Sequence, residues 1–387
     1  MVKQGLITGS GHGQGTRAMW RCLLDRFPVR GMMQTMNRRI GPVVFVTVLG
    51  FMFACPGTGL AQTFLILHPG ADHAAMAGAN TALAWDADAP FYNPAGTALL
   101  PGINAAFGIN PVQWFDKTGF WNGAGTWAFR PGLSVGAFAD GVWQPYVHTS
   151  PIWGRLSEGE FGLNAAWAPF DWLSAGVNAK HLGTFIAIDD SDLGVHVRDN
   201  AWAVAADFGL LVRHSTRIGQ FRAGGSAQNL GTKMQWTDPV YVDDVLPRTV
   251  RAGAAWVLRA ADVASGLGFG QQASDLFGED WLQDNWRFCL AYDYTTYGNL
   301  RFYPQPEHSV GAELRPVPFL VLRGGWFYSG EGSEYEVRKG LTWGLGLDLR
   351  YVRFDVCDDD VMYYRQPQEK WLKWSVSVNI GQPLFHM

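Results

Sequence analysis

The chain has 387 residues and a formal net charge of −4, and charged residues make up 17% of it. This acidic balance argues against a protein that binds nucleic acid. The mean hydropathy of −0.04 is too low for a bundle of membrane helices, and no apolar run reaches the ~18 residues of a transmembrane helix. The 18 tryptophans and 12 tyrosines are residue types that membrane interfaces favour.

The first predicted element is an export signal. The basic stretch Asn37–Arg39 precedes the short apolar run Pro42–Ala54, and small residues follow as far as Ala61. A basic region, a short apolar core and a small-x-small site are the layout of a secretory signal. We therefore expect residues 1–61 to be a signal peptide that is cleaved after Ala61.

Two alternatives remain open within this leader. Residues 1–35 fit no part of a signal peptide, so Met32, Met33 or Met36 is an alternative start of the chain. Cys55 is an alternative acceptor for a lipid anchor, although the residues before it match the usual motif poorly.

From residue 102 onward the chain alternates between apolar and polar residues. Leu372–Ile380 places Leu, Trp, Val, Val and Ile on one face and Lys, Ser, Ser and Asn on the other. A period of two is typical of a strand with one face in an apolar medium and the other in a polar one. We expect strands at 103–110, 119–129, 133–142, 160–168, 173–183, 201–213, 219–229, 248–258, 286–294, 308–315, 319–328, 341–349, 351–356 and 372–380.

These strands predict an all-β fold, a transmembrane antiparallel β-barrel over residues 102–387. Short turns alternate with long polar connections such as 144–159 and 184–199, as in barrels whose turns face the periplasm and whose loops face outside. A soluble sandwich would alternate equally well, and the export signal decides in favour of the outer membrane. The long connection 259–285 breaks the rule, and a strand at Val263–Gly270 would raise the number from 14 to 16, so both numbers remain open.

The segment before the first strand is expected to fill the barrel. Residues 62–101 do not alternate; Gly70–Ala84 is rich in small residues, and Asn93-Pro94 has turn chemistry. A barrel of ~14 strands encloses a lumen too wide for side chains to fill, because diameter grows with strand number. We therefore predict that residues 62–101 form a hatch, or plug, inside the lumen.

Charged residues on the strands are expected to face the lumen. An Arg or Lys on the lipid face at mid-bilayer would cost ~2–4 kcal/mol. These residues either pair with one another or, in the case of one or two arginines, bind a ligand carboxylate. They are Lys180, Asp207, Arg222, Arg251, Asp293, Glu313, Arg323, Asp348 and Lys373.

The sequence has no catalytic signature, so we expect no enzyme and no cofactor. GxSxG, HExxH and P-loop motifs are missing. The histidines are scattered and predict no metal site, and acidic runs such as Asp358–Asp360 are typical of solvated loops. Cys289 and Cys357 lack CxxC spacing and are interpreted as small apolar strand residues.

A family resemblance rests on several short motifs in order. Gly78-Ala79, then Asp86 and Asp88, then Asn93-Pro94-Ala95-Gly96 resemble the N-terminal hatch of the FadL family, the bacterial outer-membrane transporters of long-chain fatty acids and hydrophobic compounds. The strand motifs Gln228–Gly231, Leu246–Arg248, Val310–Glu313 and Leu322–Trp326 are similar to the same superfamily. They are closest to its type IX secretion branch and to a spirochaetal FadL-like group.

The resemblance implies a 14-stranded barrel whose hatch moves to let apolar molecules cross the outer membrane. Asn93, Pro94, Ala95 and Gly96 match the hatch motif. The implied partners are a hydrophobic small molecule, outer-membrane lipid and the barrel-assembly machinery, although the chain ends in Phe385-His386-Met387 rather than in the usual terminal aromatic. The alternative function is an outer-membrane scaffold or secretion-shuttle subunit that binds periplasmic or secreted proteins.

Residues of the chain itself suggest where a ligand would be contacted. Phe91 and Tyr92 adjoin the hatch motif and either line an apolar pocket or pack the plug against the wall. Arg222, Arg251 and Arg323 are the candidate partners of a ligand carboxylate. Substrate identity, transport direction and oligomeric state are not predicted.

Overall fold

The computed structural model describes residues 65, 67–110, 119–149, 152–190, 195–237, 245–268, 272, 286–298, 306–329, 338–349, 351–358 and 372–380. The predicted signal peptide, its alternative starts, Cys55 and the C-terminal Phe385 lie outside these residues.

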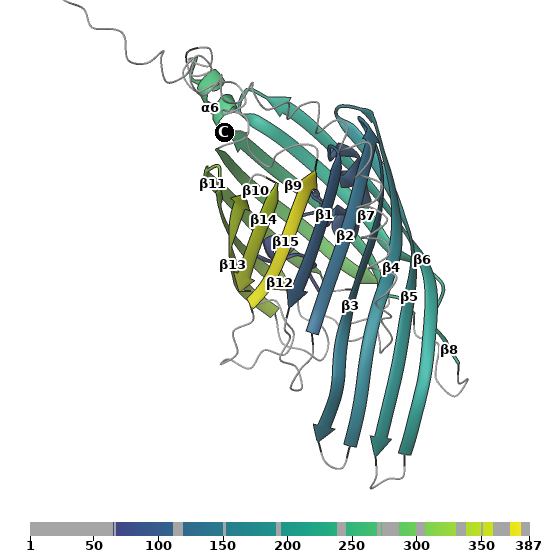
Figure 1. Ribbon diagram of the computed structural model, residues 1–387. Helices are drawn as coiled ribbons and strands as arrows, with labels where there is room; N and C mark the ends of the chain where they lie inside the picture. Colours follow the sequence, from purple (N-terminus) through teal and green to yellow (C-terminus); the bar gives the residue numbers. More distant parts are fainter. Residues whose placement is uncertain are drawn as a thin grey trace, which may run out of the picture.

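Fourteen antiparallel strands close into a barrel, as predicted (Figure 1). Each strand pairs with the next along the chain, and the first pairs with the last through contacts such as Ile103 with Ile380. The ring consists of β1 (Ile103–Asn110), β2 (Gly119–Arg130), β3 (Leu133–Thr149), β4 (Ile152–Phe170), β5 (Leu173–Asp190), β6 (Val195–Thr216), β7 (Gly219–Gly231), β9 (Arg248–Arg259), β10 (Arg287–Gly298), β11 (Glu307–Val317), β12 (Leu320–Ser329), β13 (Arg338–Leu349), β14 (Val352–Asp358) and β15 (Leu372–Ile380). A further short strand, β8 (Gln235–Trp236), pairs with β6 alone.

Strands β3 to β6 are longer than predicted and extend beyond the others in Figure 1. β3 continues to Thr149 and β4 begins at Ile152, while β5 continues to Asp190 and β6 begins at Val195. The predicted long loops at 144–159 and 184–199 are therefore wrong. Their polar residues remain in strands because backbone pairing continues wherever the neighbouring strand is equally long, whether or not one face is apolar.

The possible extra strand at Val263–Gly270 is also wrong. Residues Ala260–Gly266 form helix α6, whose first turn is closed by a hydrogen bond from the Arg259 backbone N–H to the Asp262 carboxylate, 2.9 Å long. Moreover, β9 pairs directly with β10, from Arg259 opposite Arg287 onward. No strand fits between two strands that already share a ladder, so the number is 14 rather than 16.

The faces of the strands are arranged as the alternation predicts. On β15, Trp374 is 53% exposed and faces outward, whereas Lys373 is 3% exposed and faces inward. All nine charged strand residues predicted to face the lumen are buried, and both Cys289 and Cys357 are free, buried strand residues. The outside is therefore an apolar surface and the inside a polar one. Within the described part of the chain, no helix has the length and apolarity to cross a membrane.

Residues 67–100, called here the N-terminal segment, lie inside the ring. The segment contains α4 (Ala71–Ala74), α5 (Ala89–Tyr92) and the 3₁₀ helix η2 (Pro94–Leu99). Its backbone N–H groups donate hydrogen bonds to strands that are far apart in the ring: the Ala71 N–H donates to Ser375 on β15, and the Thr81 N–H donates to Asp293 on β10. The side chain of Gln228 on β7 donates to the Phe91 carbonyl.

Candidate functional site

One row of inward-facing residues in the barrel wall consists mostly of small side chains. Neighbouring strands β5 and β6 place Gly176 directly opposite Gly209. Because glycine has no side chain, the wall there is only one backbone thick. The row that contains them runs across six strands and comprises Ser134, Ala166, Gly176, Gly209, Ser226 and Arg251.

The N-terminal segment lies directly against this row. A Cβ atom at Gly176 would lie 2.3 Å from the Pro94 carbonyl oxygen, and one at Gly209 would lie 2.1 Å from Asn93 Oδ1. Both distances are well below van der Waals contact. Glycine at the two wall positions therefore permits the segment to approach this closely.

Asn93 links the segment to the wall and also organises the segment itself. Its side-chain amide donates to the carbonyls of Thr81 and Leu210, both at 2.9 Å. One side chain thus joins a second part of the segment, at Thr81, to the wall, at Leu210. Its Oδ1 accepts the Ala95 N–H at 3.1 Å and caps η2. A buried asparagine satisfied in this way fixes the position of the chain that follows it.

The other residues of the hatch motif are packed as tightly. The Pro94 carbonyl accepts a hydrogen bond from Asn164 Nδ2 at 3.3 Å. A Cβ at Gly96 would lie 1.9 Å from the Ala84 carbonyl oxygen, so this position also requires glycine. The structure therefore brings Asn93, Pro94, Ala95 and Gly96 together behind the thin row of the wall.

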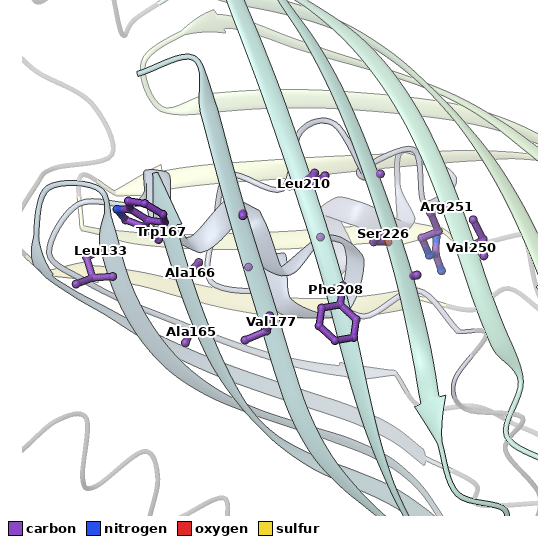
Figure 2. Close-up of a pocket in the computed structure, with 15 residues that line it drawn as sticks. Leu133, Ala165, Ala166, Trp167, Val177, Phe208, Leu210, Ser226, Val250 and Arg251 are labelled. Carbon is purple, nitrogen blue, oxygen red and sulfur yellow. The ribbon is translucent and has the colours of Figure 1, made fainter. Parts of the chain in front are cut away.

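A hollow of about 760 Å³ lies on the outer face over the same row (Figure 2). Its rim consists of exposed apolar side chains, including Trp167, Val177 and Phe208. Small outward residues such as Ala165 and Ala227 leave the space between them, while Gly176 and Gly209 form part of the floor. The apolar hollow outside and Asn93-Pro94 inside are thus separated by a single layer of backbone.

Arg251 differs from Arg222 and Arg323 because, within the described part of the chain, its guanidinium makes neither a salt bridge nor a hydrogen bond. It lines both the outer hollow and a small interior cavity of about 20 Å³. Its guanidinium lies 5.6 Å from the centre of the Tyr92 ring, and its buried Nε has no hydrogen-bond partner. The guanidinium therefore has N–H donors that are free to bind a ligand.

Arg323 and Arg222 are already engaged. Arg323 donates to Glu313 at 2.8 Å and to Asp355 at 2.5 Å. Arg222 donates to Gln220 at 2.7 Å and to the Leu83 carbonyl at 3.2 Å. These contacts join strands of the wall to one another and to the segment. Arg323 and Arg222 therefore have the structural role that the sequence analysis gave as the alternative to ligand binding.

Phe91 and Tyr92 pack the segment against the wall. The Phe91 ring meets the Phe138 ring edge to face, with centroids 5.1 Å apart. The Tyr92 hydroxyl donates to the Pro69 carbonyl at 2.7 Å, and the Tyr92 carbonyl accepts a hydrogen bond from Ser226 at 2.8 Å. Of these two rings, Phe91 lines the small interior cavity.

Sequence reasoning missed a chain of polar side chains beside the motif. Asn164 accepts from the Thr97 hydroxyl at 2.6 Å and donates to Asn178 at 2.8 Å. Asn178 in turn donates to the Pro90 carbonyl at 2.9 Å and to Asp207 at 2.8 Å. Alternation places Asn164 and Asn178 on the inward face, but nothing local to β4 or β5 indicates their partners in the segment.

Solved structures of several transporters and channels have a fold similar to that of this chain. No family model and no curated protein matches the sequence. The toluene transporter TbuX of Ralstonia pickettii is similar in structure, with a TM-score of 0.52 at 13% identity over 83% of this chain and 100% of its own. The monoaromatic hydrocarbon channel CymD has a TM-score of 0.51 at 13% identity, over 82% of this chain and 97% of its own.

The toluene transporter TodX of P. putida has a TM-score of 0.50 at 12% identity, over 81% of this chain and 99% of its own. At such identities the likeness concerns the fold. The predicted resemblance to FadL-like transporters is confirmed at that level. These neighbours are transporters and channels rather than enzymes.

Proposed function

We propose that this protein is an outer-membrane channel for hydrophobic small molecules, and that its N-terminal segment is the hatch of that channel. The observation that carries the proposal is the coincidence of the apolar outer hollow with the row of glycines against which Asn93 and Pro94 lie. A closed barrel with an apolar exterior and a filled, polar interior is the architecture of an outer-membrane protein. The transporters of the same fold agree with this assignment.

Passage of an apolar molecule requires the segment to move. The lumen beside the segment contains a cavity of only about 20 Å³, close to the volume of one water molecule. The outer hollow of about 760 Å³ falls within the ~300–1,000 Å³ typical of small-molecule sites. We infer that withdrawal of Asn93 and Pro94 opens a route between the lumen and this hollow, where the substrate meets lipid.

The substrate class follows from the lining. The rim of the hollow is apolar, which suits either an aromatic hydrocarbon or an acyl chain. Arg251 holds its guanidinium on the lumenal side of this floor, over the Tyr92 ring, and a guanidinium binds a carboxylate through two parallel hydrogen bonds. Within the proposal, long-chain fatty acids are therefore the preferred substrates, and uncharged aromatic compounds such as toluene are the alternative.

The test is permeability in proteoliposomes. Deletion of residues 62–98 should raise the leak of small hydrophilic solutes severalfold relative to the intact mature chain, and an unchanged leak would contradict a plug. The intact protein purified from membranes should carry fatty acid or another apolar molecule. Recovery of a stoichiometric periplasmic protein instead, with an empty lumen, would favour the scaffold alternative.

A further inference from the structure

Three carboxylates surround one imidazole inside the N-terminal segment. Asp72 and His73 belong to α4, and Asp86 and Asp88 lie in the turn before α5. His73 Nε2 is 3.0 Å from Asp86 Oδ1 and 4.0 Å from Asp72 Oδ1. Asp72, His73 and Asp88 are each at least nine-tenths buried, and each offers one ligand atom within 4.8 Å of the others.

Two carboxylate oxygens of the cluster lack a hydrogen-bond donor among the described residues. Asp72 Oδ1 and Asp86 Oδ2 are buried without hydrogen-bond partners. The neighbouring cation, Arg353 of β14, approaches the other oxygen of Asp72, at 3.9 Å, and is itself bonded to Asp348. Asn122 donates to Asp88 Oδ1 at 3.2 Å. An unpaired buried carboxylate oxygen costs several kcal/mol unless a cation meets it.

Gly70 lets the carboxylates of Asp72 and Asp88 approach one another. A Cβ atom at Gly70 would lie 2.7 Å from Asp88 Oδ2 and 2.9 Å from Asp72 Oδ1. Gly70 also has a φ of +79°, a conformation that other residues rarely adopt. Two carboxylate oxygens from separate parts of the segment thus lie close together, which a larger residue at position 70 would prevent.

We propose that this cluster binds one divalent transition-metal ion, with Asp72, His73 and Asp88 as ligands and with Asp86, which contacts His73 Nε2, as a further carboxylate beside the ion. A mixed set of imidazole and carboxylates suits Zn²⁺ or Mn²⁺ better than Ca²⁺, which prefers oxygen alone. Ligand atoms of tetrahedral zinc lie ~3.3 Å apart. The separations among the three ligand residues, 4.0 Å between His73 and Asp72 and at most 4.8 Å overall, require the two parts of the segment to close by about an ångström around the ion.

The consequence for the segment is a metal cross-link between α4 and the turn that leads to Asn93. The ion would join residues 72–73 to residue 88, which lie on different turns of the segment. It would thereby hold the motif residues against the wall. This inference goes beyond the proposed function, because an ion could bind here whether or not the barrel transports anything.

The test is isothermal titration of the full mature chain in detergent with ZnCl₂, after removal of metal by EDTA. We expect one ion per chain, and at least ~10-fold weaker binding in both Asp72→Asn and His73→Gln, because each removes a ligand. Asp140→Asn, a buried lumenal carboxylate that is not one of the proposed ligands, and His214→Gln, an exposed residue near the end of β6, are the matched controls and should bind zinc as the unaltered chain does. Heat-dependent gel mobility should show that each variant retains a folded barrel.

A second measurement does not depend on the behaviour of those two variants. Co²⁺ added to the unaltered chain should give a visible absorption band that Zn²⁺ abolishes, and Asp88→Asn should weaken it. The proposal is overturned if the unaltered chain binds no zinc. It is also overturned if zinc binding is unchanged in both cluster variants, or if Ca²⁺ binds in preference to Zn²⁺.

Discussion

The N-terminal segment faces two sides of the barrel wall that are built differently. On the side of the outer hollow, strands β3 to β7 contact the segment mainly through amides, hydroxyls and glycines, as in the bond from Asn164 to the Pro94 carbonyl. On the opposite side, strands β10 to β14 carry a network of buried ion pairs. Its members include Glu313 with Arg323, and Asp348 with Arg315 at 2.5 Å.

The difference indicates which side yields first. A neutral hydrogen bond contributes ~0.5–1.5 kcal/mol net, whereas removal of one partner from a buried ion pair costs ~3–5 kcal/mol. The segment can therefore leave the wall on the hollow side at a lower cost than two strands can separate at a buried ion pair. Such pairs also occur on the hollow side, where Lys180 of β5 pairs with Glu160 and Asp207. We therefore expect the segment to move and the ring of strands to stay closed.

The largest effect is expected from breaking the ion-pair side. Arg323→Met should lower the free energy of unfolding by ~3–5 kcal/mol, because it leaves the buried Asp355 without its ion-pair partner and leaves Glu313 paired with Arg287 alone. Urea titration of the protein in detergent measures the change. Arg248→Gln, at an exposed position, is the control and should alter it by less than ~0.5 kcal/mol. Equal stability of the two variants would remove the distinction between the sides.

The next effect should fall on the hollow side. Asn93→Ala removes the donors to Thr81 and Leu210 and the cap of η2, which together stabilise the seated segment by ~2–4 kcal/mol. We expect greater solute leak in liposomes with little change in the stability of the barrel. Asn104→Ala is the control, since that buried asparagine donates to Pro101 outside the segment. A leak equal to that of the control would show that Asn93 does not hold the segment.

A smaller effect should follow from thickening the wall. Gly209→Ala forces a Cβ to 2.1 Å from Asn93 Oδ1, and such overpacking costs ~1–3 kcal/mol. Protease accessibility of the segment should rise in this variant. Gly225→Ala is closely matched, because its Cβ meets only the Arg251 carbonyl at 3.7 Å, an ordinary contact. If both variants behave alike, close approach of the segment to the wall is not what holds it.

The smallest effect on stability, below ~1 kcal/mol, is expected from Arg251→Gln, since this arginine has no ion pair or hydrogen bond among the described residues to lose. Affinity for a long-chain fatty acid should nevertheless fall ~10-fold, while affinity for the matching uncharged alcohol should not change. Fluorescent-ligand displacement distinguishes the two. An equal loss for acid and alcohol would show that Arg251 does not recognise the carboxylate.

Much of the barrel was predictable because strand alternation is a local property. The even and odd positions of Leu372–Ile380 are enough to assign a strand and its outward face, and the same holds for all fourteen predicted strands. The predictions that failed concern where strands end. Residues 144–149 and 184–190 continue the ladders of β3 and β5 because the neighbouring strands are equally long, which the composition of one segment does not indicate.

The candidate site was predictable only in part. The motif Asn93–Gly96 indicated a hatch, and alternation placed Arg222, Arg251 and Arg323 on the inner face. Which arginine keeps its charge unpaired depends on the neighbours that each strand brings. Glu313 and Asp355 meet Arg323 from adjacent parts of the sheet, whereas the Tyr92 ring meets Arg251 from inside the barrel.

The amino-acid sequence by itself determined the strands, the direction of their apolar faces and the presence of a small-residue segment before them, because each depends on residues close together in the chain. Only the closed tertiary structure decided that Gly176 and Gly209 lie opposite one another, with Asn93 and Pro94 behind them and the apolar hollow in front. Those contacts join residues about a hundred positions apart. Their register depends on the closure of the whole ring, to which every strand contributes.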